Sequence, residues 1–368
     1  MSGLRLVFVG LSLSSSWGNG HATTYRSLLK GLHALGHDAL FLEQDVPWYA
    51  PHRDLLDPPF ARLALYADPE DLRRRFADAV AEADAVIVGS YVQHGPLVLD
   101  WARETARGTV AFYDIDTPVT LARLGREGHY IEPRQIPSLD LYLSFTGGPT
   151  LGRIEREHGA PLARALFCSV DTDVYRPDPA APRRWRLGYL GTYSDDRQPA
   201  LERLLLEPAR RRGGDAFAVA GPQYPDAIAW PRNVERIEHL PPDRHPAFYA
   251  AQGFTLNVTR ADMVAAGWSP SVRLFEAAAC GAPILSDRWN GLGDVFPLGE
   301  AILVADTAEE AAAALDLPEP RRRALAEAAR EVALARHSSE ARAADLVAAL
   351  EEARARRATP APRRAATP

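Results

Sequence analysis

Lysine, cysteine and long apolar runs are all scarce in this sequence of 368 residues. Lys30 is the single lysine among 42 basic side chains, so chemistry through a lysine Schiff base has one poor candidate. Cys168 and Cys280 are the two cysteines, and no CxxC pair or Cys/His spacing accompanies them. These shortages argue against a pyridoxal-phosphate enzyme, a zinc site and a disulfide framework, and we expect both cysteines to be buried packing residues.

The sequence also lacks a stretch that is typical of a membrane span or a signal peptide. The N-terminal MSGLRLVFVGLSLSSS is apolar only briefly and carries an early arginine, which favours a first buried strand. The net charge is −6, and basic side chains are spread along the predicted helices rather than gathered in one stripe. We therefore expect a cytoplasmic protein without a transmembrane segment and without a nucleic-acid partner.

The loop after this first strand, SSSWGNGH, is rich in glycine but lacks the GxGxxG pattern of dinucleotide-binding folds. Gly18 and Gly20 would allow the backbone to approach a phosphate or an acceptor closely. His21 is a candidate acid or base, although a loop histidine is more often a hydrogen-bonding or surface residue. NAD binding is therefore disfavoured, and the loop by itself is a weak indication of a ligand site.

Predicted strands and helices alternate twice along the chain, which is typical of two parallel sheets, each covered by helices on both faces. At roughly 150 residues per domain, the length also favours two domains. In the first half, strands are predicted at 4–13, 38–43, 84–90, 109–114, 139–145 and 165–170, with helices at 24–35, 69–83 and 96–107. In the second half, strands are predicted at 185–193, 215–222, 234–240, 254–259, 282–287 and 301–306, with helices at 197–212, 244–252, 271–280 and 307–315.

One further segment lies between these two alternations, and another follows the second. The polar, proline-rich stretch at 171–184 cannot continue a sheet interior and is predicted to be a linker. A long Ala/Glu/Arg helix is predicted at 318–356, broken near His337. Because ligands bind at the carboxyl ends of the strands in doubly wound sheets, the chemistry should lie in the loops that follow the strands.

The most informative of these loops leads into the stretch GWSPSVRLFEAAACGAPILSD. Ser271 stands at the start of a predicted helix, whose free N–H groups and dipole make an anion site. Arg273 adds positive charge in the first turn, and Glu276, on the same face, has the geometry to bind two ribose hydroxyls. The alternative is a plain capped helix with an Arg/Glu pair on its surface.

Several stretches resemble the family-four glycosyltransferases. FEAAACGAPILSD is similar to the family's helix in which a glutamate holds the donor ribose, CSVDTDVYRP to its interdomain crossover, and the stretch from FAVAGPQYP to FTLNVT to the segment between them. In the first half, FYDIDTPVTL and SLDLYLSFTGG look like the CgeB-like group, the spore-maturation-type glycosyltransferases. The resemblance covers residues 1 to about 355.

This resemblance implies the α/β architecture called GT-B, with two Rossmann-like doubly wound domains that face each other across a cleft. It places an acceptor domain at 1–170, a nucleotide-sugar donor domain at 171–335, and a helix at 336–356 that crosses back onto the first domain. Residues 357–368 are left as a tail with the composition of a disordered segment.

Two positions depart from the family pattern. The family's first glutamate, eight positions before the ribose-binding one, is replaced by Trp268, so its role cannot be carried over. After the first strand of the second domain, GTYSDDR keeps a cation at Arg197 but has Thr192 where an arginine is usual. Arg273 is then expected to supply one diphosphate contact, and Tyr193 to pack near the phosphates or the sugar.

Polar residues in the first domain are candidates for the acceptor side. His94 follows the predicted strand at 84–90, where similar enzymes often carry a histidine that faces the donor sugar, with a structural role as the alternative. Asp114 and Asp116 alternate at strand spacing, so one of them should face the cleft, and Pro118 favours extended backbone at Thr117. Asp116 would then bind acceptor hydroxyls or act as a base, with helix capping as the alternative role.

The sequence thus predicts a glycosyltransferase that moves a sugar, expected to be a hexosyl group, from a UDP-, dTDP- or GDP-sugar to an unknown acceptor, which could be a glycan, a protein or a small molecule. Cations and backbone N–H groups would balance the charge on the leaving diphosphate, so we expect no metal and no cofactor. A nucleotide-sugar epimerase of GT-B fold and a non-catalytic sugar- or nucleotide-binding protein remain as alternatives. The candidate catalytic residues are His94, His21 and Asp116, and the candidate donor-binding residues are Tyr193, Arg197, Ser271, Arg273 and Glu276.

Overall fold

The computed structural model describes residues 3–17, 20–126 and 129–358, and the chain divides into two compact units. The first unit comprises Met1–Phe167 and Arg342–Pro368, and the second comprises Cys168–Ala341. Each unit has its own parallel sheet and its own hydrophobic core. Both cysteines are buried, as expected, and they do not form a disulfide bond with each other.

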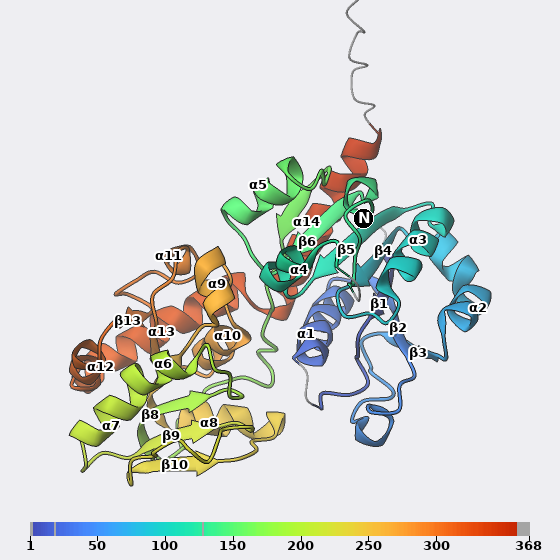
Figure 1. Cartoon of the computed structure of the whole chain (residues 1–368). Helices are drawn as coiled ribbons and strands as arrows, with labels where there is room; N and C mark the ends of the chain where they lie inside the picture. Colours follow the sequence, from blue (N-terminus) through green and yellow to red (C-terminus); the bar gives the residue numbers. More distant parts are fainter. Residues whose placement is uncertain (1–2, 18–19, 127–128, 359–368) are drawn as a thin grey trace, which may run out of the picture. The chain divides into compact units, whose positions relative to one another are not determined.

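Within the described residues, the sheet of the first unit has seven parallel strands in the order β3-β2-β1-β4-β5-β6-β7 (Figure 1). The strand β1 lies between β2 and β4, so the chain builds the sheet first on one side of β1 and then on the other. The central strands are apolar throughout, because helices cover both of their faces. The strands are β1 (Arg5–Gly10), β2 (Asp38–Gln44), β3 (Arg62–Tyr66), β4 (Ala85–Gly89), β5 (Thr109–Asp114), β6 (Leu141–Ser144) and β7 (Ala163–Ala165).

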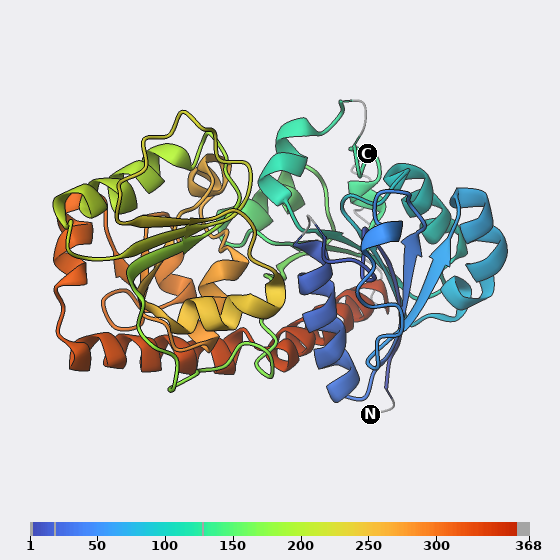
Figure 2. The same cartoon turned by 90° about the horizontal axis from the view of Figure 1, so that it is seen from below.

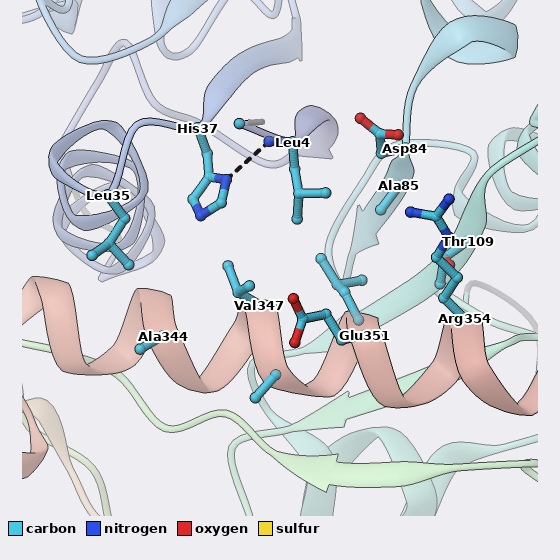
Figure 3. A pocket seen from close by; sticks show the side chains of 13 residues that line it. Leu4, Leu35, His37, Asp84, Ala85, Thr109, Ala344, Val347, Glu351 and Arg354 are labelled. Atoms are coloured by element: carbon cyan, nitrogen blue, oxygen red, sulfur yellow. Dashed lines mark hydrogen bonds between the residues drawn. The ribbon is translucent and has the colours of Figure 1, made fainter. Parts of the chain in front are cut away.

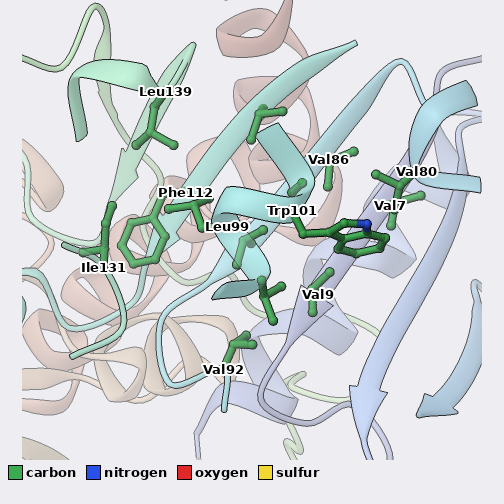
Figure 4. Close-up of a cluster of buried hydrophobic side chains, with 14 of the residues drawn as sticks. Val7, Val9, Val80, Val86, Val92, Leu99, Trp101, Phe112, Ile131 and Leu139 are labelled. Atoms are coloured by element: carbon green, nitrogen blue, oxygen red, sulfur yellow. The ribbon is translucent and has the colours of Figure 1, made fainter. Parts of the chain in front are cut away.

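Helices pack on both faces of this sheet. One face meets α2 (Pro69–Glu82), α3 (Gly95–Thr105), α4 (Thr117–Arg123) and α5 (Pro149–Arg156). Figure 4 shows part of this core, where Leu99 and Trp101 of α3 lie over the side chains of the central strands. The opposite face meets α1 (His21–Ala34) and α14 (Ser339–Ala358).

The sheet of the second unit repeats this topology. Its parallel strands have the order β10-β9-β8-β11-β12-β13, which reverses beside β8. One face packs against α6, α7 and α12, and α8 packs against the other. The strands are β8 (Trp185–Leu190), β9 (Phe217–Ala220), β10 (Val234–Ile237), β11 (Gln252–Asn257), β12 (Ile284–Ser286) and β13 (Leu303–Val304). The helices are α6 (Gln198–Leu201), α7 (Glu207–Arg211), α8 (His245–Ala250), α9 (Ala261–Ala266), α10 (Val272–Ala279), α11 (Leu292–Val295), α12 (Ala308–Leu315) and α13 (Glu319–Arg336), with a π-helical turn at Glu202–Leu206.

The last helix, α14, returns the chain to the first unit (Figure 2). Its apolar residues Ala343, Leu346, Leu350 and Ala353 join the core under α1. The Arg164 guanidinium donates to both carboxylate oxygens of Glu352, at 2.9 and 2.5 Å, and fixes this helix to the end of the sheet. The predicted long helix is indeed broken at His337, which separates α13 from α14.

The structure differs from the sequence predictions at several boundaries. The predicted strand at 165–170 is only the short β7, Ala163–Ala165, because the chain passes into the second unit after Phe167. Residue 341 is the last of the second unit, so the expected domain boundary at 335/336 falls six residues early. The α14 helix continues to Ala358, and the rest of the predicted tail, 359–368, lies outside the described residues.

Several short elements were not predicted, namely β3, α4, α5, α9 and α11. The expectation of extended backbone at Thr117 is wrong, because Thr117 opens α4 with Pro118 in its first turn. Proline is tolerated there because the first turn of a helix has no intrahelical acceptor for its missing N–H. No helix of the described residues is long and apolar enough to cross a membrane.

Candidate functional site

In the second unit, Arg273 occupies the point at which the strand order reverses. Its Nε donates to the carbonyl of Leu190 at the end of β8, at 2.5 Å, and its Nη1 donates to Asn257 Oδ1 at the end of β11, at 2.9 Å. The guanidinium also lies over the ring of Tyr189, 4.7 Å from its centroid. The Arg273 side chain is buried, and its positive charge lies at the carboxyl ends of the strands, where ligands bind in such folds.

The N-terminus of α10 also lies at the carboxyl ends of these strands. Ser271 is the N-cap residue, but its hydroxyl donates to Asn257 Oδ1 at 2.8 Å rather than capping the helix. The first-turn N–H groups of α10 are therefore left without a side-chain cap, while Arg273 stands in that turn. This combination of amide groups, helix dipole and cation favours an anion.

Glu276, one turn further along α10, is buried rather than on the surface. The Tyr249 hydroxyl donates to its Oε2 at 2.8 Å, and His245 Nδ1 lies 4.0 Å from the same oxygen. Burial and the neighbouring Glu276 charge together raise the pKa of Tyr249 well above its usual value, which keeps the phenol a donor. The alternative of an Arg/Glu pair on the helix surface is wrong, because both side chains are buried and each binds other groups.

The loop after β8 carries the other two predicted donor residues. Arg197 donates from Nη2 to the carbonyl of Thr192 at 2.8 Å and from Nε to Ser194 Oγ at 3.2 Å, which folds the loop around its guanidinium. Tyr193 donates to Asp195 Oδ1 at 2.6 Å. Both side chains are partly exposed.

Two glycines bring the loops after β8 and β9 into close contact. Gly221 has a φ of 138°, and a Cβ atom there would lie 2.1 Å from the carbonyl oxygen of Gly191. Tyr224 also donates to that oxygen at 3.1 Å. Any side chain at Gly221 would separate these loops, so the glycine is required by close approach of the two backbones.

Sequence reasoning missed the residues that hold this site together. Asn257 accepts from both Ser271 and Arg273, and its amide donates to Ser286 Oγ at 2.9 Å. Asp287 accepts from Thr259 through both the backbone N–H and the hydroxyl. Their positions in the sequence could have identified them. Asn257 is the last residue of β11 and Asp287 directly follows β12, so each is a polar residue near the carboxyl end of a predicted strand.

In the first unit, two candidate residues and two neighbouring tyrosines meet at the carboxyl ends of the strands. The Tyr91 hydroxyl donates to Asp116 Oδ2 at 2.8 Å, and the His21 ring packs edge-on against the Tyr91 ring with centroids 4.9 Å apart. The Tyr130 ring is tilted against the Tyr91 ring, with the two centroids 4.2 Å apart. The structure thus brings His21 and Asp116 to one place through Tyr91, a residue that sequence reasoning did not select.

His21 and Asp116 have distinct surroundings. Burial lowers the pKa of His21 to about 4, so the imidazole is neutral at physiological pH, and its Nδ1 has no hydrogen-bond partner among the described residues. Asp116 is the N-cap residue of α4, but its side chain does not cap the helix. The capping alternative for Asp116 is therefore wrong, because the carboxylate binds Tyr91 instead. Gly18 of the preceding loop lies outside the described residues.

Asp114, at the end of β5, is completely buried and does not face solvent. It accepts from Tyr142 Oη at 2.6 Å, from Thr120 Oγ1 at 2.7 Å and from the N–H of Asp116 at 3.2 Å. Burial raises the pKa of Asp114 to about 6, against the lowering effect of these hydrogen bonds. Of the two alternating aspartates, Asp116 is the one that is partly exposed.

His94 follows Tyr91 by three residues in the loop after β4. It is the N-cap residue of α3, its side chain is exposed, and its φ of 56° is left-handed. Tyr91, in the same loop, has a φ of 66°. Two non-glycine residues with left-handed backbone in one loop after β4 indicate strain of the kind that is concentrated at functional sites.

A cavity of about 670 Å³ lies at the opposite end of the first sheet (Figure 3). Its wall includes Leu4, Ala85 and Thr109, where β1, β4 and β5 begin, and Val347 and Arg354 of α14. It therefore lies away from the carboxyl ends of the strands, where His21 and Asp116 are found. Among the described residues, no three His, Cys, Asp or Glu side chains converge as a metal site would require.

A family model described as glycosyl transferase-like matches residues 197–348, which is less than half of the chain. The matched part includes Arg197, α10 and most of the second unit. A comparison with curated proteins finds no match.

Solved glycosyltransferase structures match nearly the whole chain. Sucrose-phosphate synthase from Thermosynechococcus elongatus is 15% identical, with a TM-score of 0.65 over 96% of this chain and 100% of that one. HepE from Anabaena, in complex with UDP-glucose, is 13% identical, with a TM-score of 0.68 over 95% and 100%. The catalytic domain of starch synthase IV from Arabidopsis thaliana, bound to ADP and acarbose, is 13% identical, with a TM-score of 0.69 over 96% and 99%. The chain therefore has the GT-B fold, as predicted.

Proposed function

We propose that this protein is a metal-independent glycosyltransferase that transfers a hexosyl group from a nucleotide diphosphate sugar to an acceptor, and that it belongs to the CgeB-like group. The observation that supports the donor site best is the juxtaposition of Arg273 with the N-terminus of α10, whose first-turn amides have no side-chain cap. The match of residues 197–348 to a glycosyl transferase-like model supports the same part of the chain.

In this proposal, the second unit binds the donor. The α10 amides after Ser271, together with Arg197 and Arg273, bind the diphosphate and stabilise the negative charge that grows on it as the glycosidic bond breaks. Glu276 accepts from the ribose hydroxyls, and Tyr193 packs beside the phosphates or the sugar. Because these groups supply the positive potential, the proposal requires no metal. The neighbours that bind UDP-glucose and ADP make UDP- and ADP-sugars the first donors to test.

The first unit then supplies the acceptor side. In this proposal, Asp116, whose carboxylate binds the Tyr91 hydroxyl, accepts a proton from an acceptor hydroxyl, and neutral His21 is the second candidate for that role. His94 is exposed at the same end of the sheet and is proposed as a sugar contact. We propose that the reaction takes place in the cytoplasm.

The test is incubation of the full chain with UDP-, ADP-, GDP- and dTDP-sugars, with and without a panel of glycan, peptide and small-molecule acceptors. Release of nucleotide diphosphate together with a glycosylated product supports the proposal. Epimerised donor in the absence of acceptor would support a GT-B epimerase instead. Binding of nucleotide sugar without turnover against the whole panel would support a non-catalytic binding protein.

A further inference from the structure

The loop before α10 contains Trp268 in an unusual backbone conformation. Its φ is 42°, and the preceding Gly267 has a φ of 67°. Left-handed backbone is a genuine outlier for a residue as bulky as tryptophan and persists only where the surroundings impose it. The strain makes Trp268 a candidate for a functional role.

Three contacts impose this conformation. The N–H of Trp268 donates to the carbonyl of Asn290 at 2.6 Å, and its indole Nε1 donates to Asp294 Oδ2 at 2.5 Å. The ring also lies on the backbone of Gly291, where a Cβ atom would be only 2.3 Å from Trp268 Cγ. The indole is thus fixed at its N–H edge and against Gly291, yet Trp268 remains partly exposed.

The position of Trp268 relates it to the donor site. It lies three residues before Ser271, the N-cap residue of α10, and its partners Gly291 and Asp294 lie in the segment that follows β12. Both segments lie at the carboxyl ends of the strands of the second sheet, as does Arg273. A group attached to a diphosphate bound at α10 would extend into this neighbourhood.

We propose that Trp268 is the platform on which the transferred hexose of the nucleotide sugar stacks, and that Asp294 holds the indole in place and accepts from a sugar hydroxyl. The C–H groups on one face of a hexose carry weak positive charge and pack against the negative π face of an aromatic ring. The carboxylate of Asp294 keeps a second oxygen for a hydroxyl while Oδ2 binds the indole. This inference rests on the proposed function and adds the residues that recognise the sugar.

The experiment compares the affinity of UDP-glucose with that of UDP by calorimetry, and ADP-glucose with ADP, for the full chain and its variants. The wild type should bind the nucleotide sugar more tightly than the nucleotide. Trp268→Ala should lower the affinity for the nucleotide sugar by about tenfold and leave that for the nucleotide unchanged. Gly291→Ala should have the same effect, because its new methyl group displaces the ring rather than removing it.

Trp48→Ala is the matched control, because Trp48 is 50% exposed and lies in the first unit. It should leave both affinities unchanged. An equal loss of both affinities in Trp268→Ala would overturn the inference, since the ring would then support only the fold of the loop. Unchanged affinities in Trp268→Ala would overturn it too. If no nucleotide or nucleotide sugar binds the wild type, the proposed donor site itself is wrong, which is a distinct outcome.

Discussion

The hydroxyl of Tyr249 donates a 2.8 Å hydrogen bond to Glu276 Oε2, which fixes the carboxylate that we propose for ribose binding. Glu276 lies on α10 and Tyr249 on α8, so this hydrogen bond joins two helices of the second unit. A carboxylate held in this way loses little side-chain entropy when it binds a ligand.

Glu276→Ala should weaken binding of the nucleotide donor by about 1–3 kcal/mol, because hydrogen bonds from the ribose to a charged acceptor are lost. Calorimetry with UDP, ADP, GDP and dTDP would measure the effect. Tyr249→Phe is the control, because it removes the internal hydrogen bond but keeps the carboxylate, and its affinities should change less. Equal affinities of wild type and Glu276→Ala for every nucleotide would exclude Glu276 from the site.

Arg197→Lys should not restore the activity that Arg197→Ala loses. A lysine ammonium cannot bind Thr192 and Ser194 in the fork geometry of a guanidinium and present a further N–H to a phosphate. Steady-state kinetics with the best donor would measure kcat and KM for both variants. Arg211→Lys, in an exposed ion pair of the second unit, is the control and should be neutral. Full activity of Arg197→Lys would show that a point charge is sufficient.

The raised pKa of Asp114 predicts that the contribution of this residue to the free energy of unfolding decreases as the pH rises. Burial raises the pKa of Asp114 from 3.8 to about 6, so the folded protein keeps a proton that the unfolded chain releases between these values. The contribution of Asp114 to the free energy of unfolding should therefore fall by about 2 kcal/mol from pH 4 to pH 6.5. Asp114→Asn removes this pH dependence while keeping the size of the side chain.

Urea unfolding of wild type and Asp114→Asn between pH 4 and pH 6.5 would measure this difference. Asp57→Asn, at an exposed position of the same unit, is the control. The variant should gain stability relative to wild type as the pH rises. A constant difference between the two proteins across this range would contradict a raised pKa.

His21 should contribute a pH dependence of the opposite sign. Burial lowers the pKa of His21 from 6.5 to about 4, so between these values the unfolded chain binds a proton that the folded protein does not. Its contribution to the free energy of unfolding should therefore rise by about 3 kcal/mol from pH 4 to pH 6.5. His21→Gln should lose this increase in urea unfolding, whereas His33→Gln, at an exposed position of the same helix, should not. Identical pH profiles for His21→Gln and wild type would show that His21 titrates normally.

The sequence by itself determined the architecture. Apolar runs of strand length that alternate with amphipathic helices can bury both faces of a strand only in a parallel sheet with helices on each side. The motif FEAAACGAPILSD placed α10 correctly, and the break at His337 separated α13 from α14 as predicted. The short edge strand β3 was missed, because RLALY begins with an exposed arginine and most of its other residues are only partly buried, so its apolar pattern is weak.

Only the tertiary structure decided which polar groups meet. Whether Arg273 faces solvent or the end of β8 depends on strands far from it in the sequence, and its partner Leu190 is 83 residues away. The same is true of Tyr91 and Asp116, whose strands become neighbours only when β4 pairs with β5. Local sequence fixes backbone periodicity, because it depends on neighbours along the chain. The partners of a buried charge are selected by the packing of remote segments, because each buried polar group must find a hydrogen bond wherever the fold places it.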